Sequence, residues 1–182
     1  TQFDAGMVEK SGLVKADILG IKTLTMVSDC MDLVLKNHNF NFKEEVKGVP
    51  YIYRLPDADA GVFSDFYNKD TDSSFQFNTE LIKGYAQEFC PLNRADLMSM
   101  TALCRPGALD APLYDTTAAQ YFMDVKNGKR TVEYLHEDLA SILGDYNGVF
   151  VYQEEIMKFL VDVVGYTWEE SDLIRSAIAK KK

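Results

Sequence analysis

The chain has 182 residues, of which 47% are hydrophobic and 12% aromatic, enough for one compact domain or two small lobes that share a core. Its formal net charge of -9 excludes a protein whose whole surface attracts nucleic acid phosphates, so any such contact must be local. No apolar run approaches the ~20 residues that a membrane span needs. Three scattered cysteines predict a reducing, cytoplasmic setting rather than a disulfide framework or a zinc cluster.

Both ends of the chain predict a segment of a longer protein. Thr1 stands where an initiator methionine is expected, and neither a basic region nor an apolar stretch of a secretory signal follows it. The other end stops abruptly within a run of lysines. We therefore expect flanking sequence on both sides.

The N-terminal part predicts a strand followed by a buried helix. Residues 13–19 alternate apolar and polar side chains, which puts Lys15 and Asp17 on the same side of an extended chain. Apolar residues then recur every three or four positions, as on one face of a helix, at Leu24, Val27, Met31, Val34 and Leu35. Between residues 37 and 74 this periodicity fades, and glycine, proline, Asn and Asp favour loops and short irregular elements.

The rest of the chain predicts helices joined by turns. Asn78 or Thr79 caps one helix and Asn93 the next, which Pro106 ends because proline supplies no amide hydrogen. Thr167 and Glu170 have the spacing of a capping box at the start of the last helix. The other predicted elements are a helix from about 115 to the turn at 127–128, a helix at 136–143, a strand at 149–152 and a helical stripe at 156–164.

These elements together predict a mostly helical α+β fold with a few strands at the N-terminal end. Within it, Lys15 and Asp17 place opposite charges in an otherwise apolar strand, where an unpaired charge is costly. The simpler interpretation is a strand edge that faces water, because any half-exposed strand alternates in this way. Basic residues cluster at 126–130 and again at 175–182, so a surface with separate basic and acidic regions is compatible with the sequence.

Several segments resemble, in the same order, the palm and fingers of bacterial DNA polymerase III alpha subunits. They span nearly the whole chain, and several motifs in one order are more specific than any single motif. The matching segments are 1–4, 8–9, 12–25, Phe75-Gln76-Phe77, 102–107, 136–139, 148–154, 165–167 and 172–182. The resemblance implies that residues 1–36 are the C-terminal part of an incomplete palm. Residues 37–182 are then a helical fingers region that continues beyond the end of the chain.

The resemblance implies a DNA-directed DNA polymerase, a nucleotidyltransferase of DNA replication that uses two Mg²⁺ ions held by three palm aspartates. Asp17 matches the third of these aspartates. Lys15 matches a lysine expected to meet phosphate near the nucleotide or the primer end. The other two aspartates lie upstream of this segment in the family, so we expect the isolated fragment to be inactive.

The resemblance also suggests residues that bind nucleotide or DNA. Arg175 matches the first of two neighbouring arginines that would lie beside the incoming triphosphate, but Ser176 replaces the second, which weakens the expected charge neutralisation. Ala179 likewise stands where the family usually has glycine. Lys180, Lys181 and Lys182 either contact DNA or triphosphate or are only solvated.

Two further positions are candidates with an open role. Arg105 follows a helix, where it either interacts with the negative end of that helix or points at phosphate. Tyr152 and Gln153 belong to a polar group next to a predicted strand, expected to serve as scaffold and to allow a contact with template or nucleotide. Tryptophan and the tyrosines fit core positions better than base-stacking ones.

The expected partners are primer-template DNA, deoxynucleoside triphosphates and the remaining parts of the polymerase subunit. Regions outside this chain are expected to contact a replicative clamp and holoenzyme subunits. No contact with a membrane is expected. The main alternative is a non-enzymatic helical binding module of the same family, favoured by the acidic balance and the missing second arginine. A weaker one is a metal-dependent phosphoesterase that uses Asp57, Asp59 and Asp17, although the order of the motifs makes the first two an ordinary acidic turn.

Overall fold

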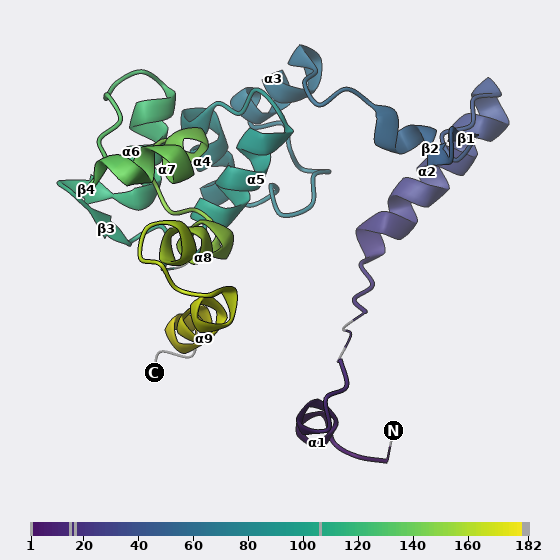
Figure 1. Cartoon of the computed structure of the whole chain (residues 1–182). Helices are drawn as coiled ribbons and strands as arrows, with labels where there is room; N and C mark the ends of the chain where they lie inside the picture. The colour runs from purple at the N-terminus through teal and green to yellow at the C-terminus, as the bar shows by residue number, and fades with distance from the viewer. Residues whose placement is uncertain (1, 15, 17, 106, 180–182) are drawn as a thin grey trace. The chain divides into compact units, whose positions relative to one another are not determined.

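The computed structural model describes residues 2–14, 16, 18–105 and 107–179, and Figure 1 shows their helices and strands. The chain divides into two compact units, residues 1–55 and residues 56–182, here called unit 1 and unit 2. Helices dominate the described part of both units, and in each unit the described residues form one two-stranded antiparallel sheet. This confirms the predicted mostly helical α+β fold. The predicted boundary between palm and fingers at residue 36 stays a prediction.

Unit 1 is built around one long helix. Its elements are α1 (Ala5–Lys10), α2 (Lys22–His38), β1 (Glu45–Val46), β2 (Val49–Pro50) and the 3₁₀ helix η1 (Tyr51–Arg54). The apolar spacing correctly predicted α2, which ends where Asn39 adopts a left-handed conformation and donates its N–H to the carbonyl of Leu35 at 3.0 Å. However, α2 has no buried residue, so the predicted burial is not found within this unit.

The strand predicted for residues 13–19 is not formed by those of its residues that the structure describes. Val14 and Ile18 are 94% and 96% exposed, and no described segment pairs with them. An extended chain without a neighbouring strand has no hydrogen-bond ladder, which explains the difference. Lys15 and Asp17, the two residues that carried the interest of this segment, lie outside the described residues.

Unit 2 packs its helices around an aromatic core. Its elements are α3 (Ala60–Asn68), α4 (Glu80–Phe89), α5 (Arg94–Leu103), β3 (Pro112–Leu113), β4 (Thr116–Thr117), α6 (Ala118–Lys126), η2 (Glu137–Leu139), α7 (Ala140–Leu143), η3 (Gly144–Tyr146), α8 (Gln153–Asp162) and α9 (Trp168–Ala179). The rings of Phe89 and Phe122 stack at 5.5 Å between α4 and α6. A smaller apolar cluster centres on α7 and contacts Phe159 of α8.

The predicted helix starts are confirmed by their caps. Asn93 accepts the N–H of Asp96 at 2.9 Å at the start of α5. Thr167 and Glu170 cap α9 reciprocally, since each side chain accepts the other residue's backbone N–H, at 3.2 and 2.9 Å. Thr79 caps α4 through the N–H of Ile82, at the longer distance of 3.4 Å.

Three elements of unit 2 before residue 144 differ from the prediction. The loop predicted up to residue 74 contains α3, whose first turn is capped by Asp59. The helix predicted from about residue 115 begins at Ala118, because residues 112–117 form the β3–β4 hairpin. The helix predicted at 136–143 is split into η2 and α7, which follow each other directly. None of the described helices is both long and apolar enough to cross a membrane.

Candidate functional site

A groove of about 610 Å³ lies in unit 2 between α5 and the N-terminus of α8. Its polar walls are formed by Arg94, Thr101, Arg105, Tyr152, Gln153 and Glu154. Its apolar lining is formed by Phe77, Leu97, Met98, Ala102 and Val151. The groove therefore combines cationic and hydrogen-bonding groups with an apolar floor.

The α5 side of the groove carries an arginine at each end. Arg94, Leu97 and Thr101 follow at spacings of three and four residues, which puts them on the same face of α5, and Arg105 lies two residues beyond the end of the helix. Arg94 forms an ion pair with Asp57 at 2.5 Å, whereas Arg105 donates its Nε–H to the carbonyl of Thr101 at 3.2 Å. Arg105 therefore interacts with the end of α5, as one of its two expected roles requires, and also lines the groove.

The α8 side is held by a buried carboxylate. Glu155 is 5% exposed and accepts the backbone N–H groups of Val151 and Tyr152, at 3.0 and 2.5 Å. Burial raises the pKa of Glu155, and the two backbone N–H groups act in the opposite direction. Because these amides bond to Glu155, they join no sheet, and residues 149–152 do not form the predicted strand.

The last helix contacts a residue of the groove wall, Gln153, through one arginine. The NH1 group of Arg175 in α9 donates to the side-chain oxygen of Gln153 at 3.0 Å. Asp172, one turn earlier on α9, accepts the Nε–H group of Arg175 at 2.8 Å and forms an ion pair with its NH2 group at 2.7 Å. The hydroxyl of Ser171, which is fully buried, donates to the carbonyl of Met157 at 3.2 Å and ties α9 to α8.

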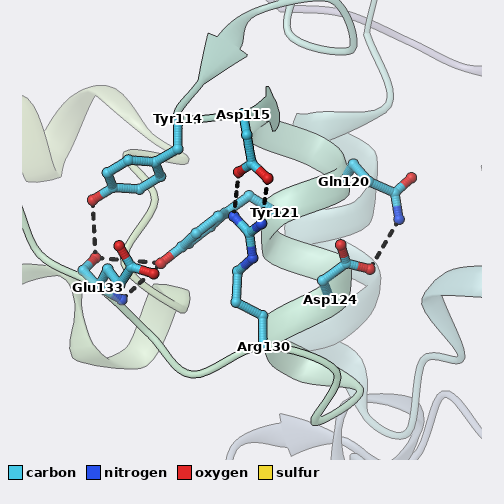
Figure 2. Close-up of polar contacts among 7 residues, drawn as sticks. All are labelled: Tyr114, Asp115, Gln120, Tyr121, Asp124, Arg130 and Glu133. Atoms are coloured by element: carbon cyan, nitrogen blue, oxygen red, sulfur yellow. Dashed lines mark hydrogen bonds and ion pairs between the residues drawn. The ribbon is translucent and has the colours of Figure 1, made fainter.

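The basic cluster at residues 126–130 is largely compensated by acidic partners. The amino group of Lys126 lies 3.3 Å from Asp96 and also donates to the carbonyl of Cys90 at 2.9 Å. Arg130 forms two hydrogen bonds of 2.8 Å with Asp115, as Figure 2 shows, and this hydrogen-bonded pairing lowers the pKa of Asp115. This cluster is therefore a weaker phosphate attractor than its sequence suggests.

The acidic turn before α3 has local structural roles. Asp59 accepts the N–H groups of Gly61 and Val62 at the start of α3, at 2.8 and 3.2 Å, and Asp57 pairs with Arg94. Across the ranges that the structure describes, no group of three or more His, Cys, Asp or Glu side chains could hold a metal ion. Asp17 is outside those ranges, so the structure does not test its predicted metal role.

The structure thus brings together four of the residues predicted to bind nucleotide or DNA. Arg105, Tyr152 and Gln153 line the groove, and Arg175 is hydrogen-bonded to Gln153. Lys180, Lys181 and Lys182, like Lys15, lie outside the described residues. Sequence reasoning missed Arg94. Its position directly after the Asn93 cap and its spacing relative to Thr101 and Arg105 are the signals that could have found it.

The described residues define a helix-rich α+β protein with one arginine-flanked groove in its larger unit. Residues 23–182 match the family described as the bacterial DNA polymerase III alpha subunit finger domain. The chain belongs to this family.

Curated relatives match over the whole chain. DNA polymerase III subunit alpha of Aquifex aeolicus is 35% identical over 184 residues, that of Bacillus subtilis 34% over 183 residues and that of Escherichia coli 31% over 187 residues. Each alignment covers 100% of this chain but 15% of the relative. The chain therefore corresponds to about one seventh of the length of these proteins.

Proposed function

We propose that this chain is part of a DNA-directed DNA polymerase and that the groove between α5 and α8 contacts nucleotide or template. Membership of the finger domain family supports the first part of the proposal. One observation carries the second part: the four described residues expected to bind nucleotide or DNA line one groove or bond to it. Cationic groups beside apolar and aromatic surface suit a ligand with both phosphates and bases.

In this proposal the incoming triphosphate lies beside Arg175, and Gln153 orients the guanidinium. Gln153 accepts a hydrogen bond from Arg175 without neutralising it, whereas the ion pair with Asp172 offsets part of the positive charge. Tyr152 and Arg105 then contact the base and the phosphate of the same nucleotide or of the template next to it. The missing second arginine, at Ser176, leaves this chain with less charge than the family pattern provides.

The catalytic part of the proposal rests on residues outside the described ranges. Asp17 would be one ligand of a two-Mg²⁺ site, and Lys15 would meet phosphate beside it. In such a site the metal ions activate the attacking hydroxyl and stabilise the leaving pyrophosphate. Since one carboxylate cannot hold two metals, the isolated chain is expected not to extend a primer.

The proposed partners are primer-template DNA, deoxynucleoside triphosphates and the rest of the polymerase subunit. Contacts with a replicative clamp and other holoenzyme subunits would lie outside this chain. The cytoplasmic location expected from the cysteines also stays a prediction.

A binding module without catalytic function is the second candidate. The net charge of -9 and the ion pairs that compensate Lys126 and Arg130 favour it, because both weaken the attraction for DNA. The two candidates differ in what Asp17 does. In the complete subunit, Asp17→Asn abolishes turnover of a polymerase without unfolding it, whereas a binding module keeps all its function.

The groove itself is tested by equilibrium binding of a single-stranded oligonucleotide and of a deoxynucleoside triphosphate. Arg105→Ala and Tyr152→Ala should each weaken binding by about five- to tenfold, the size expected for a lost phosphate contact or base stack. Lys158→Ala is the matched control, because it removes a positive charge from an exposed position of α8 outside the groove. Equal effects of Lys158→Ala and Arg105→Ala would refute a site at this groove.

A further inference from the structure

Every nitrogen of the Arg175 side chain has an acceptor within the protein. Nε donates to Oδ1 of Asp172 at 2.8 Å, and NH1 donates to Gln153 at 3.0 Å. NH2 lies 2.7 Å from the same Asp172 oxygen, within ion-pair distance. NH2 also donates to the hydroxyl of Ser176 at 3.3 Å. Protein groups therefore orient the guanidinium of Arg175, while NH1 and NH2 each carry a second N–H group.

The acceptors of Arg175 differ in charge. Gln153 and Ser176 are neutral, so they orient the guanidinium without reducing its attraction for an anion. Asp172 is an acid that accepts the Nε–H group of Arg175 and also forms an ion pair with its NH2 group, as a phosphate can. The carboxylate of Asp172 thus uses the same guanidinium groups that a ligand phosphate would use.

The ion pair between Asp172 and Arg175 is weak enough for an anionic ligand to replace Asp172. Both residues lie on α9, three positions apart, and their side chains are 54% and 31% exposed. Ion pairs with this spacing and exposure are weak, because water and salt compete for both charges. A ligand that carries several adjacent negative charges can displace the carboxylate while Gln153 keeps the guanidinium at the groove.

We propose that Asp172 is a positioning residue that occupies Arg175 in the unliganded protein and gives way to the triphosphate of an incoming nucleotide. This inference rests on the proposed function of Arg175. In this role, Asp172 competes with the nucleotide for Arg175 and so weakens nucleotide binding. When no nucleotide is bound, it also keeps the guanidinium of Arg175 oriented. A carboxylate that did not pair with Arg175 would not change the affinity in this way.

The inference predicts opposite effects for the two partners of Arg175. Asp172→Asn removes the competing charge but keeps an oxygen that can accept from Arg175, so triphosphate binding should become about two- to fivefold tighter. Gln153→Ala removes the neutral contact that directs Arg175 to the groove, so binding should weaken by a similar factor. A residue with a purely structural role would weaken binding in both cases.

The test is titration of the 182-residue chain with inorganic tripolyphosphate, followed by nuclear magnetic resonance at the Nε–H of Arg175 and at backbone amides. Wild type is compared with Asp172→Asn, Arg175→Ala and the double variant. Glu169→Gln is the matched control, because it removes one negative charge from the exposed first turn of the same helix. The prediction is tighter binding for Asp172→Asn alone, and no gain from Asp172→Asn once Arg175 is removed.

The outcomes separate this inference from the proposed function. If Arg175→Ala weakens binding while Asp172→Asn leaves it unchanged or weaker, Asp172 is not a competitor and the role of Arg175 stands. If Arg175→Ala has no effect, the proposed role of Arg175 fails first. An equal gain for Glu169→Gln and Asp172→Asn reflects net charge alone and overturns the inference.

Discussion

The phenol oxygen of Tyr121 lies 2.7 Å from the backbone nitrogen of Glu133 and accepts its N–H. Tyr121 is fully buried in α6, and its ring packs 5.1 Å from that of Tyr114, whose hydroxyl donates to the carbonyl of Glu133 (Figure 2). Two tyrosines thus fix the segment after α6 by its backbone. That segment leads to Gly148 and the groove, so its placement affects the candidate site.

Tyr121→Phe tests this contact. The variant keeps the ring in the core but leaves the Glu133 amide without its partner, which should lower the free energy of unfolding by about 1–3 kcal/mol. Tyr114→Phe is the control, because its hydroxyl makes a longer contact of 3.2 Å at an exposed position. Chemical denaturation measures both. A loss for Tyr114→Phe as large as that for Tyr121→Phe would contradict the assignment.

A side chain at Gly148 should lower the stability of the fold. It has φ +78°, and an added Cβ would lie 2.8 Å from Cγ2 of Val132 and 3.0 Å from the carbonyl oxygen of Glu133. Gly128 has a similar φ of +70° but open space around it. Gly128→Ala should therefore cost about 1 kcal/mol for the left-handed backbone alone. Gly148→Ala should cost about 1–3 kcal/mol more for the steric clash.

Thermal melts of the two glycine variants separate the two causes. If both variants lose the same stability, the backbone conformation accounts for the whole effect and the close approach of residues 132 and 133 does not matter. Gly148→Ala could also weaken oligonucleotide binding in proportion to its loss of stability. That result would show that the conformation at Gly148 affects the groove residues that follow it in the chain.

The pH dependence of stability should report the buried carboxylate of Glu155. Burial raises its pKa above the ordinary value of 4.5, so the folded protein binds this proton more tightly than the unfolded chain does. The unfolding free energy of wild type should therefore fall as the pH rises from 4.5 through the raised pKa. Of the neighbouring groups, Glu154, a carboxylate on the same helix, also raises the pKa.

Glu155→Gln should remove this pH dependence. The amide oxygen of Gln can still accept the N–H groups of Val151 and Tyr152, while the buried charge is gone. Melting temperatures measured at about pH 4 and pH 8 should show the variant gaining on wild type as the pH rises. An equal loss at both pH values would mean that the carboxylate shape, and not its charge, matters.

Helix starts could be predicted from the sequence because their signals are local. Asn93 and Thr167 cap their helices through side chains that reach amides three residues later. The same kind of signal was available for Glu155, three residues after Tyr152, but the apolar run at 149–151 favoured a strand. An apolar run of that length does not by itself distinguish a strand from a buried connection.

The groove could not be predicted, because it depends on residues far apart in the sequence. Arg175 meets Gln153 across 22 positions, and Lys126 meets Asp96 across 30 positions. Only packing brings such pairs together, and packing also decides which charges are compensated. The basic cluster at 126–130 therefore appeared freer in the sequence than it is in the fold, while Arg94 was overlooked.

The contact between α8 and α9 gives the last prediction. Ser171 is fully buried and donates to the carbonyl of Met157, so no room is left for a larger side chain. Ser171→Leu should destabilise the packing of α9 by about 1–3 kcal/mol. It should also separate Arg175 from Gln153 and reproduce the binding loss of Arg175→Ala.

Ser171→Ala is the control for this prediction. It removes the hydroxyl but not the close packing, so we expect a loss of about 1 kcal/mol and no change in binding. Hydrogen exchange of the α9 amides measures the local opening directly. Ser171→Leu could speed exchange in α9 without weakening tripolyphosphate binding. That outcome would show that phosphate binding does not depend on the contact between Arg175 and Gln153.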